Sequence, residues 1–103
     1  MVSFFRVPGM RTDGRPFDEA TIEAVWRKGT PEPGLVTFRK DMCGASMQRN
    51  LYGKTVEWGW EIDHIVPVSR GGTDNLGNLQ PLQWENNRAK GDDFPQFTCK
   101  VRS

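Results

Sequence analysis

The alternation of apolar and polar residues is clearest in the segment EWGWEIDHIV, residues 57–66. Apolar Trp58, Trp60 and Ile62 alternate there with small or polar residues. A repeat of two residues is the period of a β-strand, because successive side chains of a strand point to opposite faces of the sheet. This segment is therefore predicted to be a strand.

Two further elements are predicted directly after it. A short second strand is expected at 79–82, and a helix at 84–90 that ends at Gly91. The loop between the two strands contains SRGGTDN, a run rich in turn-forming residues. The order over 58–91 is therefore strand, loop, strand, helix.

An additional helix is predicted nearer the N-terminus, in FDEATIEAVWRKG (17–29). Asp18 is placed to accept the free N–H groups of its first turn, and Gly29 is placed to end it. Phe17 and Ile22 have the spacing of a hydrophobic staple across the helix start. We expect this helix to be structural.

The segments around that helix have weaker patterns. Residues 1–16 are rich in Arg, Gly and Pro and are predicted to form an extended arm, whereas TPEPG (30–34) is predicted to be a loop. LVTFR (35–39) is predicted to be a short strand. Residues 40–54 show no clear period, apart from a predicted turn at Tyr52 and Gly53.

Length and composition indicate one folded domain, 1–103, with the arm and first helix in 1–34 and the core in about 58–92. The chain has 103 residues, of which 36% are hydrophobic and 26% are charged. A net charge of +1 neither requires nor excludes a nucleic-acid partner. Several basic side chains nevertheless occur in the loop and helix of the predicted core and just after them: Arg70, Arg88, Lys90, Lys100 and Arg102.

No targeting or membrane segment is expected. The apolar run in MVSFFRVPGM is broken by Arg6 and Pro8, and no apolar run is long enough to cross a bilayer. The two cysteines, Cys43 and Cys99, belong to no CxxC pair. We expect reduced thiols in a cytoplasmic protein, with a disulfide left open as the alternative.

The single histidine, His64, follows Asp63 at the end of the predicted strand. Histidine is ordinarily largely neutral at pH 7, as a general base must be, and a carboxylate is a hard oxygen ligand for a metal. A lone histidine is more often a surface or core residue, so His64 alone would not indicate a site. If both act together, the strand is predicted to twist or end here.

The predicted helix WENNRAKG adds Asn87 and Lys90, which are three residues apart and share one face. An asparagine carbonyl can bind a metal, and a lysine one turn later can meet a phosphate. Two adjacent asparagines within a helix carry a small energetic cost, although solvated asparagines without a role also occur. Asn78, just before the second strand, is placed to bond the backbone of the loop.

The runs IDHIVPVSRGG, DNLGNLQPL and NNRAKGD together resemble the HNH nuclease family, in the variant whose third signature residue is asparagine. The resemblance covers about residues 59–92. It implies an α+β fold with a ββα-metal core, two strands and a helix around one divalent cation. The N-terminal helix and the short antiparallel strands would be additions to that core.

Carried over by position, the resemblance implies a role for each signature residue. His64 would be the catalytic general base that activates water, and Asn78 would fix the loop that orients it. Asp63 and Asn87 would be the metal ligands. Lys90 is a predicted phosphate contact, and the other predicted nucleic-acid contacts are Arg88 and Arg70.

The implied cofactor and substrate follow from these ligands. One carboxylate and one amide suit Mg²⁺, and Mn²⁺ is compatible. No structural zinc is expected, because Ser46 stands where a second thiol would follow Cys43. The expected partner is DNA, most simply double-stranded, with RNA left open, and the protein would act as a monomer or homodimer.

Two other classes of function remain as alternatives. A catalytically silent nucleic-acid-binding module of the same fold would use the basic residues on the phosphate backbone. A structural or protein-interaction domain would use the four tryptophans and leave the motif spacing as coincidence. A cleavage assay separates the nuclease from both.

Overall fold

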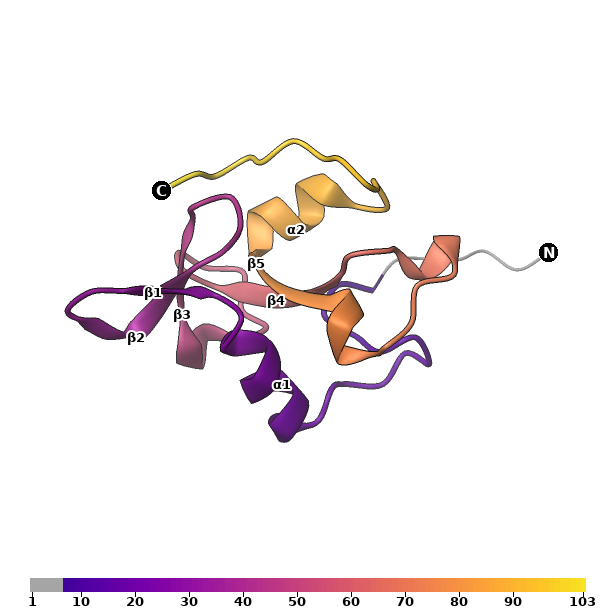
Figure 1. Cartoon of the computed structure of the whole chain (residues 1–103), viewed down its shortest axis with the longest axis horizontal. Coiled ribbons are helices and arrows are strands. Elements are labelled where there is room, and N and C mark those ends of the chain that lie inside the picture. Colours follow the sequence, from indigo (N-terminus) through magenta and orange to yellow (C-terminus); the bar gives the residue numbers. More distant parts are fainter. Residues whose placement is uncertain (1–6) are drawn as a thin grey trace.

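The computed structural model describes residues 7–103, which form an α+β fold of two helices and antiparallel strands (Figure 1). One sheet has the order β1-β2-β3 and the other pairs β4 with β5. The helices and strands are α1 (Glu19–Trp26), β1 (Thr30–Glu32), β2 (Leu35–Lys40), β3 (Ser46–Gln48), β4 (Trp60–His64), β5 (Leu79–Gln83) and α2 (Trp84–Lys90). Single 3₁₀ turns lie at Arg49–Leu51, Val68–Arg70 and Leu76–Asn78.

Helix α1 begins as the sequence predicts. Asp18 is its N-cap, and the carboxylate accepts the Thr21 N–H at 2.8 Å. Phe17 and Ile22 are both buried in one core cluster, as expected of a staple. The helix ends at Trp26, two residues before the predicted end.

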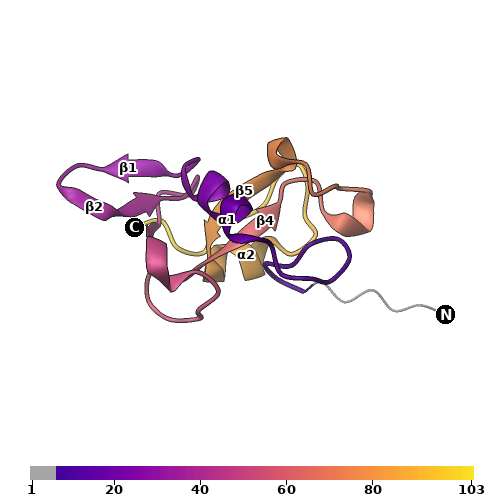
Figure 2. The ribbon, with the colours of Figure 1, turned by 90° about the horizontal axis from the view of Figure 1, so that it is seen from below.

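The prediction of a loop over 30–34 is wrong. Residues Thr30–Glu32 form β1, which pairs antiparallel with β2, and only the turn at Gly34 is irregular, with φ 79°. Pro31 is tolerated because β1 is an edge strand, where a missing N–H donor removes no central hydrogen bond. The predicted strand at 35–39 is confirmed as β2. This hairpin projects at one end of the molecule, as both views show (Figure 2).

Strand β4 begins at Trp60 rather than at Trp58. Trp58 has φ 66° and packs edge-on against Phe38 of β2, with ring centroids 5.1 Å apart. Gly59 permits this turn, since a Cβ there would lie 1.8 Å from the Lys54 carbonyl oxygen. The strand ends at His64, as predicted.

All five residues of β4 are buried, although its alternating pattern is typical of a strand with one exposed face. The reason is that α1 lies on one side of the β4–β5 pair and α2 on the other (Figure 1). In the pair, Trp60 faces Gln83 and His64 faces Leu79. Gln83 then caps α2 by accepting the N–H groups of Glu85 and Asn86. The predicted order of strand, strand and helix is thus confirmed.

The main apolar core lies on the α1 side of β4. The Trp26 and Trp60 rings lie 5.0 Å apart and form the centre of this core. Its buried members are Phe17, Ile22, Val25, Trp26, Met47, Trp60, Ile62 and Leu79.

The N-terminal arm is folded rather than extended within residues 7–16. Met10 and Pro16 form a β-bridge that closes a small loop. The Tyr52 hydroxyl donates to the Gly9 carbonyl at 3.1 Å. Burial, aided by the negative charge of Glu61, raises the pKa of Tyr52 to about 12, so this hydroxyl remains a donor. Residues 1–6 of the predicted arm lie outside the described residues.

No helix within residues 7–103 combines the length and apolar character needed to span a bilayer.

The expectation of reduced thiols is wrong, because Cys43 and Cys99 form a disulfide with Cα atoms 5.9 Å apart. The two residues are 56 positions apart in the sequence, and hydrogen bonds close to each of them join both segments to Asn86 of α2. Asp41 accepts a hydrogen bond from Asn86 at 3.0 Å, and Asn86 accepts the N–H of Val101 at 2.7 Å. These bonds hold the C-terminal segment against α2 (Figure 1). The cysteines therefore do not indicate a reducing compartment, and the cytoplasmic location stays a prediction.

We predict that Cys99→Ser lowers the free energy of unfolding by about 2–4 kcal/mol, since the disulfide restricts the unfolded chain over a long loop. Denaturant unfolding with and without dithiothreitol measures the effect. Reductant should lower the wild-type midpoint and leave that of Cys99→Ser in place. An unchanged wild-type midpoint would contradict the prediction.

Candidate active site

Two carboxylates of β4, Glu61 and Asp63, point toward α2 and are buried there. The Asn87 amide donates to Glu61 Oε1 at 2.8 Å, and the Lys90 Nζ lies 3.2 Å from Asp63 Oδ1. Gln80 of β5 donates to Asp63 Oδ2 at 2.9 Å. The predicted metal ligands Asp63 and Asn87 thus both lie in the contact between β4 and α2.

Two cations balance these two buried carboxylates. Lys90 is 2% exposed, and Arg88 donates from Nη2 to Glu61 Oε2 at 2.8 Å. The hydrogen bond to Glu61 raises the pKa of the Arg88 guanidinium. Buried charges without partners would strongly destabilise the fold, so this pairing fixes how α2 sits on β4.

His64 lies on the other face of β4. Its ring packs near Phe17, with centroids 5.9 Å apart, and its Nε2 lies 2.8 Å from Asp74 Oδ1. The His64 carbonyl accepts a hydrogen bond from Lys90 Nζ at 3.0 Å. Lys90 therefore links the histidine backbone to the Asp63 side.

A cavity of about 280 Å³ adjoins His64 between the arm and the loop that follows β4. Its lining includes Arg11 and Thr12 from the arm and Pro67 and Ser69 from the loop. Asp92, just after α2, also lines it. The histidine thus faces a space that a substrate or water can enter.

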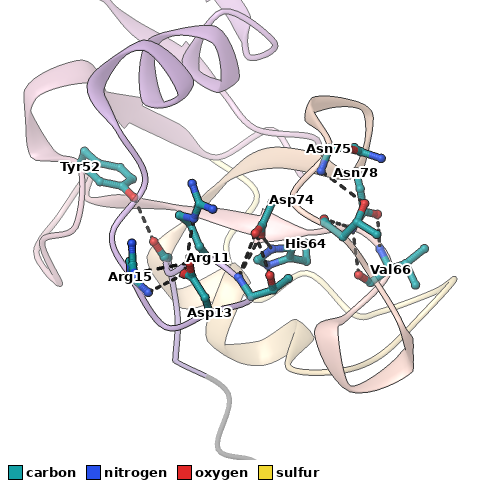
Figure 3. A network of polar contacts seen from close by, with 12 residues as sticks. Arg11, Asp13, Arg15, Tyr52, His64, Val66, Asp74, Asn75 and Asn78 are labelled. Carbon is teal, nitrogen blue, oxygen red and sulfur yellow. Dashed lines mark hydrogen bonds and ion pairs between the residues drawn. The ribbon is translucent and has the colours of Figure 1, made fainter.

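Asp74 joins His64 to the arm (Figure 3). The Thr12 N–H donates to its Oδ1 at 3.0 Å and its Oδ2 at 3.2 Å, and the Thr12 hydroxyl donates to Oδ2 at 2.8 Å. Burial by itself would raise the pKa of Asp74, but the hydrogen bonds from His64 and Thr12 outweigh it and lower that pKa.

Asn78 holds the loop between β4 and β5 (Figure 3). Its Oδ1 accepts the Val66 N–H at 2.8 Å, and its Nδ2 donates to the carbonyls of Val66 and Thr73 at 3.1 and 2.9 Å. The Asn78 carbonyl also accepts the Ile65 N–H at 2.8 Å. The first residues after His64 are thereby fixed in place.

The three predicted nucleic-acid contacts differ in their surroundings. Arg70 is exposed in the 3₁₀ turn Val68–Arg70 beside the cavity. The Arg88 side chain is 46% exposed but is paired with Glu61. Lys90 points inward to Asp63. A substrate can therefore reach Arg70 directly, and Lys90 only after its ammonium leaves Asp63.

Several residues of this network were not predicted from the sequence. Glu61 shares a face with Asp63 because the two are two residues apart in a strand, and that spacing was a usable signal. Thr12 and Asp74 are 62 positions apart, and no local pattern indicates such a contact. Asp74 itself lies in a turn-rich loop, where an acidic residue is ordinary.

The two predicted ligands carry oxygen atoms, which are the donors that a hard divalent cation prefers. Within residues 7–103 no group of three or more His, Cys, Asp or Glu side chains is arranged as a metal site. The predicted set is smaller, one carboxylate and one amide, and such sets leave most coordination positions to water and substrate oxygens. The Lys90 ammonium 3.2 Å from Asp63 shows that a positive charge is accommodated beside this carboxylate.

Comparison with known proteins gives one family match. The family described as HNH endonuclease matches residues 42–93, which is 52 of the 103 residues when both ends are counted. The matched region contains β4, β5, α2 and the loop with Asn78. Neither the curated proteins nor the solved structures gave a match.

We predict that Asn78→Ala lowers the free energy of unfolding by about 2–4 kcal/mol, because it removes three hydrogen bonds to the loop, two of them partly buried and one exposed. Hydrogen exchange at the Val66 amide should accelerate. The matched control is Asn75→Ala, since the exposed Asn75 makes no side-chain capping bond. Equal stability of the two variants would contradict the loop-fixing role.

Proposed function

Because the chain belongs to the HNH endonuclease family, we propose that it is a metal-dependent endonuclease that hydrolyses phosphodiester bonds of DNA. Membership of this family indicates a nuclease or nucleic-acid-related function. One observation supports the more specific proposal of metal-dependent DNA cleavage. The matched region contains all four proposed site residues: Asp63 and His64 on β4, Asn78 in the loop and Asn87 on α2.

His64 is the proposed general base. A neutral imidazole accepts a proton from water and so makes the water a stronger nucleophile toward phosphorus. The ring adjoins the cavity beside the loop, and the bonds of Asn78 fix the backbone that follows it. Cleavage would leave 5′-phosphate and 3′-hydroxyl ends.

Asp63 and Asn87 are the residues that would hold the cation, Mg²⁺ or in its place Mn²⁺. When bound, such a cation neutralises charge on the scissile phosphate and assists the departing oxygen. In the structure Asp63 is already paired with Lys90, so binding of the cation would displace the ammonium from this carboxylate. The displaced Lys90 could then meet a substrate phosphate, as its sequence position predicts.

DNA is the proposed substrate, because the mechanism uses no 2′-hydroxyl, and RNA stays open. Arg70, exposed beside the cavity, is the first expected phosphate contact. The second is Arg88, a partly exposed residue of α2. One such site cuts one strand, so a double-strand break would need a homodimer or two separate nicks.

The second candidate is a silent nucleic-acid-binding module of the same fold. The contact between Lys90 and Asp63 favours it, because an internal cation occupies the carboxylate that the metal would use. Such a module would bind DNA through its arginines and show no turnover. The assay below separates the two functions.

We predict that the purified protein nicks supercoiled plasmid in the presence of Mg²⁺ or Mn²⁺ and that EDTA stops the reaction. His64→Ala, Asp63→Ala and Asn87→Ala should each reduce the rate by about 100-fold or more, since each removes the base or a ligand. Agarose gels that resolve supercoiled, nicked and linear plasmid measure the rate.

Glu57→Gln is the control, because Glu57 is an exposed carboxylate just before β4. It should cut at the wild-type rate. Circular dichroism should show that each variant is folded. A folded wild type that binds plasmid without cutting it under any divalent ion supports the silent module, and His64→Ala cutting at full rate rejects the mechanism.

A separate prediction concerns DNA binding without cleavage. In a His64→Ala background with EDTA, adding Arg70→Ala should reduce the slope of log Kd against log salt concentration by about one, because one phosphate contact is lost. Fluorescence anisotropy across several salt concentrations measures the slope. Lys54 is an exposed cation in the loop before β4, and Lys54→Ala should leave the slope unchanged. Equal slopes for the Arg70 and Lys54 variants would remove Arg70 from the interface.

A further inference from the structure

We propose that Asp74, held by Thr12 of the N-terminal arm, is a positioning residue that fixes the His64 ring with its Nε2–H as donor and its Nδ1 as the proton acceptor. This inference rests on the proposed role of His64 as general base. It adds a carboxylate that carries no signature role, and a threonine that lies outside the matched residues 42–93.

The geometry fixes the direction of the hydrogen bond. His64 Nε2 lies 2.8 Å from Asp74 Oδ1, and an ionised carboxylate has acceptors only. The pKa of Asp74 is lowered by its hydrogen bonds from His64 and Thr12, which outweigh the effect of burial, so the group is ionised at neutral pH. The imidazole must therefore donate from Nε2, which leaves the neutral ring with its lone pair on Nδ1.

The carboxylate is itself held from the other side. Thr12 donates its N–H to both oxygens and its hydroxyl to Oδ2, so the carboxylate cannot rotate without breaking bonds. Figure 3 shows Asp74 between the His64 ring and the arm. Only 23% of the Asp74 side chain is exposed, which limits the competition from water for its oxygens.

The arm is anchored independently of Asp74. The Met10–Pro16 bridge closes its loop, and the Tyr52 hydroxyl bonds to the Gly9 carbonyl. Thr12 is therefore presented by a preformed loop rather than by a free chain end. A base whose orientation is set in advance loses less freedom when it meets its substrate, which favours the reaction step rather than substrate binding.

The chain contains a single histidine, so its ring signals in long-range ¹H–¹⁵N NMR spectra need no assignment. In spectra of the neutral ring, the wild type should show the Nε2–H tautomer. In Asp74→Asn the amide can donate to the ring, so the population should shift toward Nδ1–H. A wild-type ring in the Nδ1–H form overturns the inference without any variant.

Kinetics give the second readout. Asp74→Asn should lower kcat by about 10- to 100-fold, the range seen when a metal-ligating histidine loses its orienting hydrogen bond, and should leave KM within about twofold. Thr12→Val keeps the N–H bonds and loses the hydroxyl bond, so a smaller fall, about 2- to 10-fold, is expected. Asp13→Asn removes a carboxylate from the same arm and should match the wild type.

The outcomes separate this inference from the proposed function. If the wild type cuts DNA and His64→Ala does not, but a folded Asp74→Asn keeps both the wild-type kcat and the wild-type tautomer, the positioning role is wrong and the nuclease stands. If no cleavage occurs, the nuclease proposal fails, while the NMR measurement still decides whether Asp74 sets the tautomer. If Asp74→Asn does not fold, the tautomer of the wild type and the kcat of Thr12→Val test the positioning role of Asp74 instead.

Discussion

The fold depends on the pairing of polar and charged side chains that β4 carries into the interior. Glu61, Asp63 and His64 are all buried. Both carboxylates have partners on α2, and the histidine has its partner in the loop before β5. Removing one partner of a buried pair costs far more than a surface pair contributes. The positions of α2 and of the loop are thus constrained by charge as well as by apolar contact.

This constraint produces two chemically different faces on one strand. Because successive side chains of a strand alternate, the adjacent residues Asp63 and His64 point to opposite sides. The face with Asp63 holds carboxylate and amide oxygens and the Lys90 ammonium. The face with His64 adjoins the cavity and the Asp74 carboxylate. Lys90 bridges the two, since it contacts both the Asp63 side chain and the His64 carbonyl. The segments beyond the matched region support each side: the arm through Thr12, and the C-terminal segment through Asn86 and the disulfide.

The sequence predicts those parts of the fold that depend on local pattern. Both helices, the strand at 35–39 and the order of elements over 58–91 follow from periodicity and capping residues. The edge strand β1 was missed because Pro31 lies in its middle and Pro33 follows directly after it, and β3 because three residues show no period. Burial of both faces of β4 could not be predicted, since it depends on helices that pack from distant segments.

The site could be predicted only where its contacts are close in sequence. Asn78 lies near the loop that it fixes, and its bonds to the loop are as expected. The contacts of Asp74 with Thr12 and of Cys43 with Cys99 join residues 62 and 56 positions apart, and single-sequence patterns carry no information at that range. The two asparagines of α2 could be predicted in part. Asparagine disfavours a helix interior, which indicated that they have a role. Only the structure shows that Asn86 holds the C-terminal segment and that Asn87 bonds to Glu61.

The proposed mechanism requires that the base and the cation share one site, although the side chains of His64 and Asp63 leave β4 on opposite faces. Titration with Mn²⁺ tests it directly, because a bound paramagnetic ion broadens NMR signals of nearby nuclei. We predict that sub-stoichiometric Mn²⁺ broadens the signals of the single histidine ring in the wild type and in Glu57→Gln, and that Asp63→Asn or Asn87→Ala abolishes the effect. Histidine signals that stay sharp at saturating Mn²⁺, or that broaden equally in all four proteins, would show that the base and the cation do not share this site.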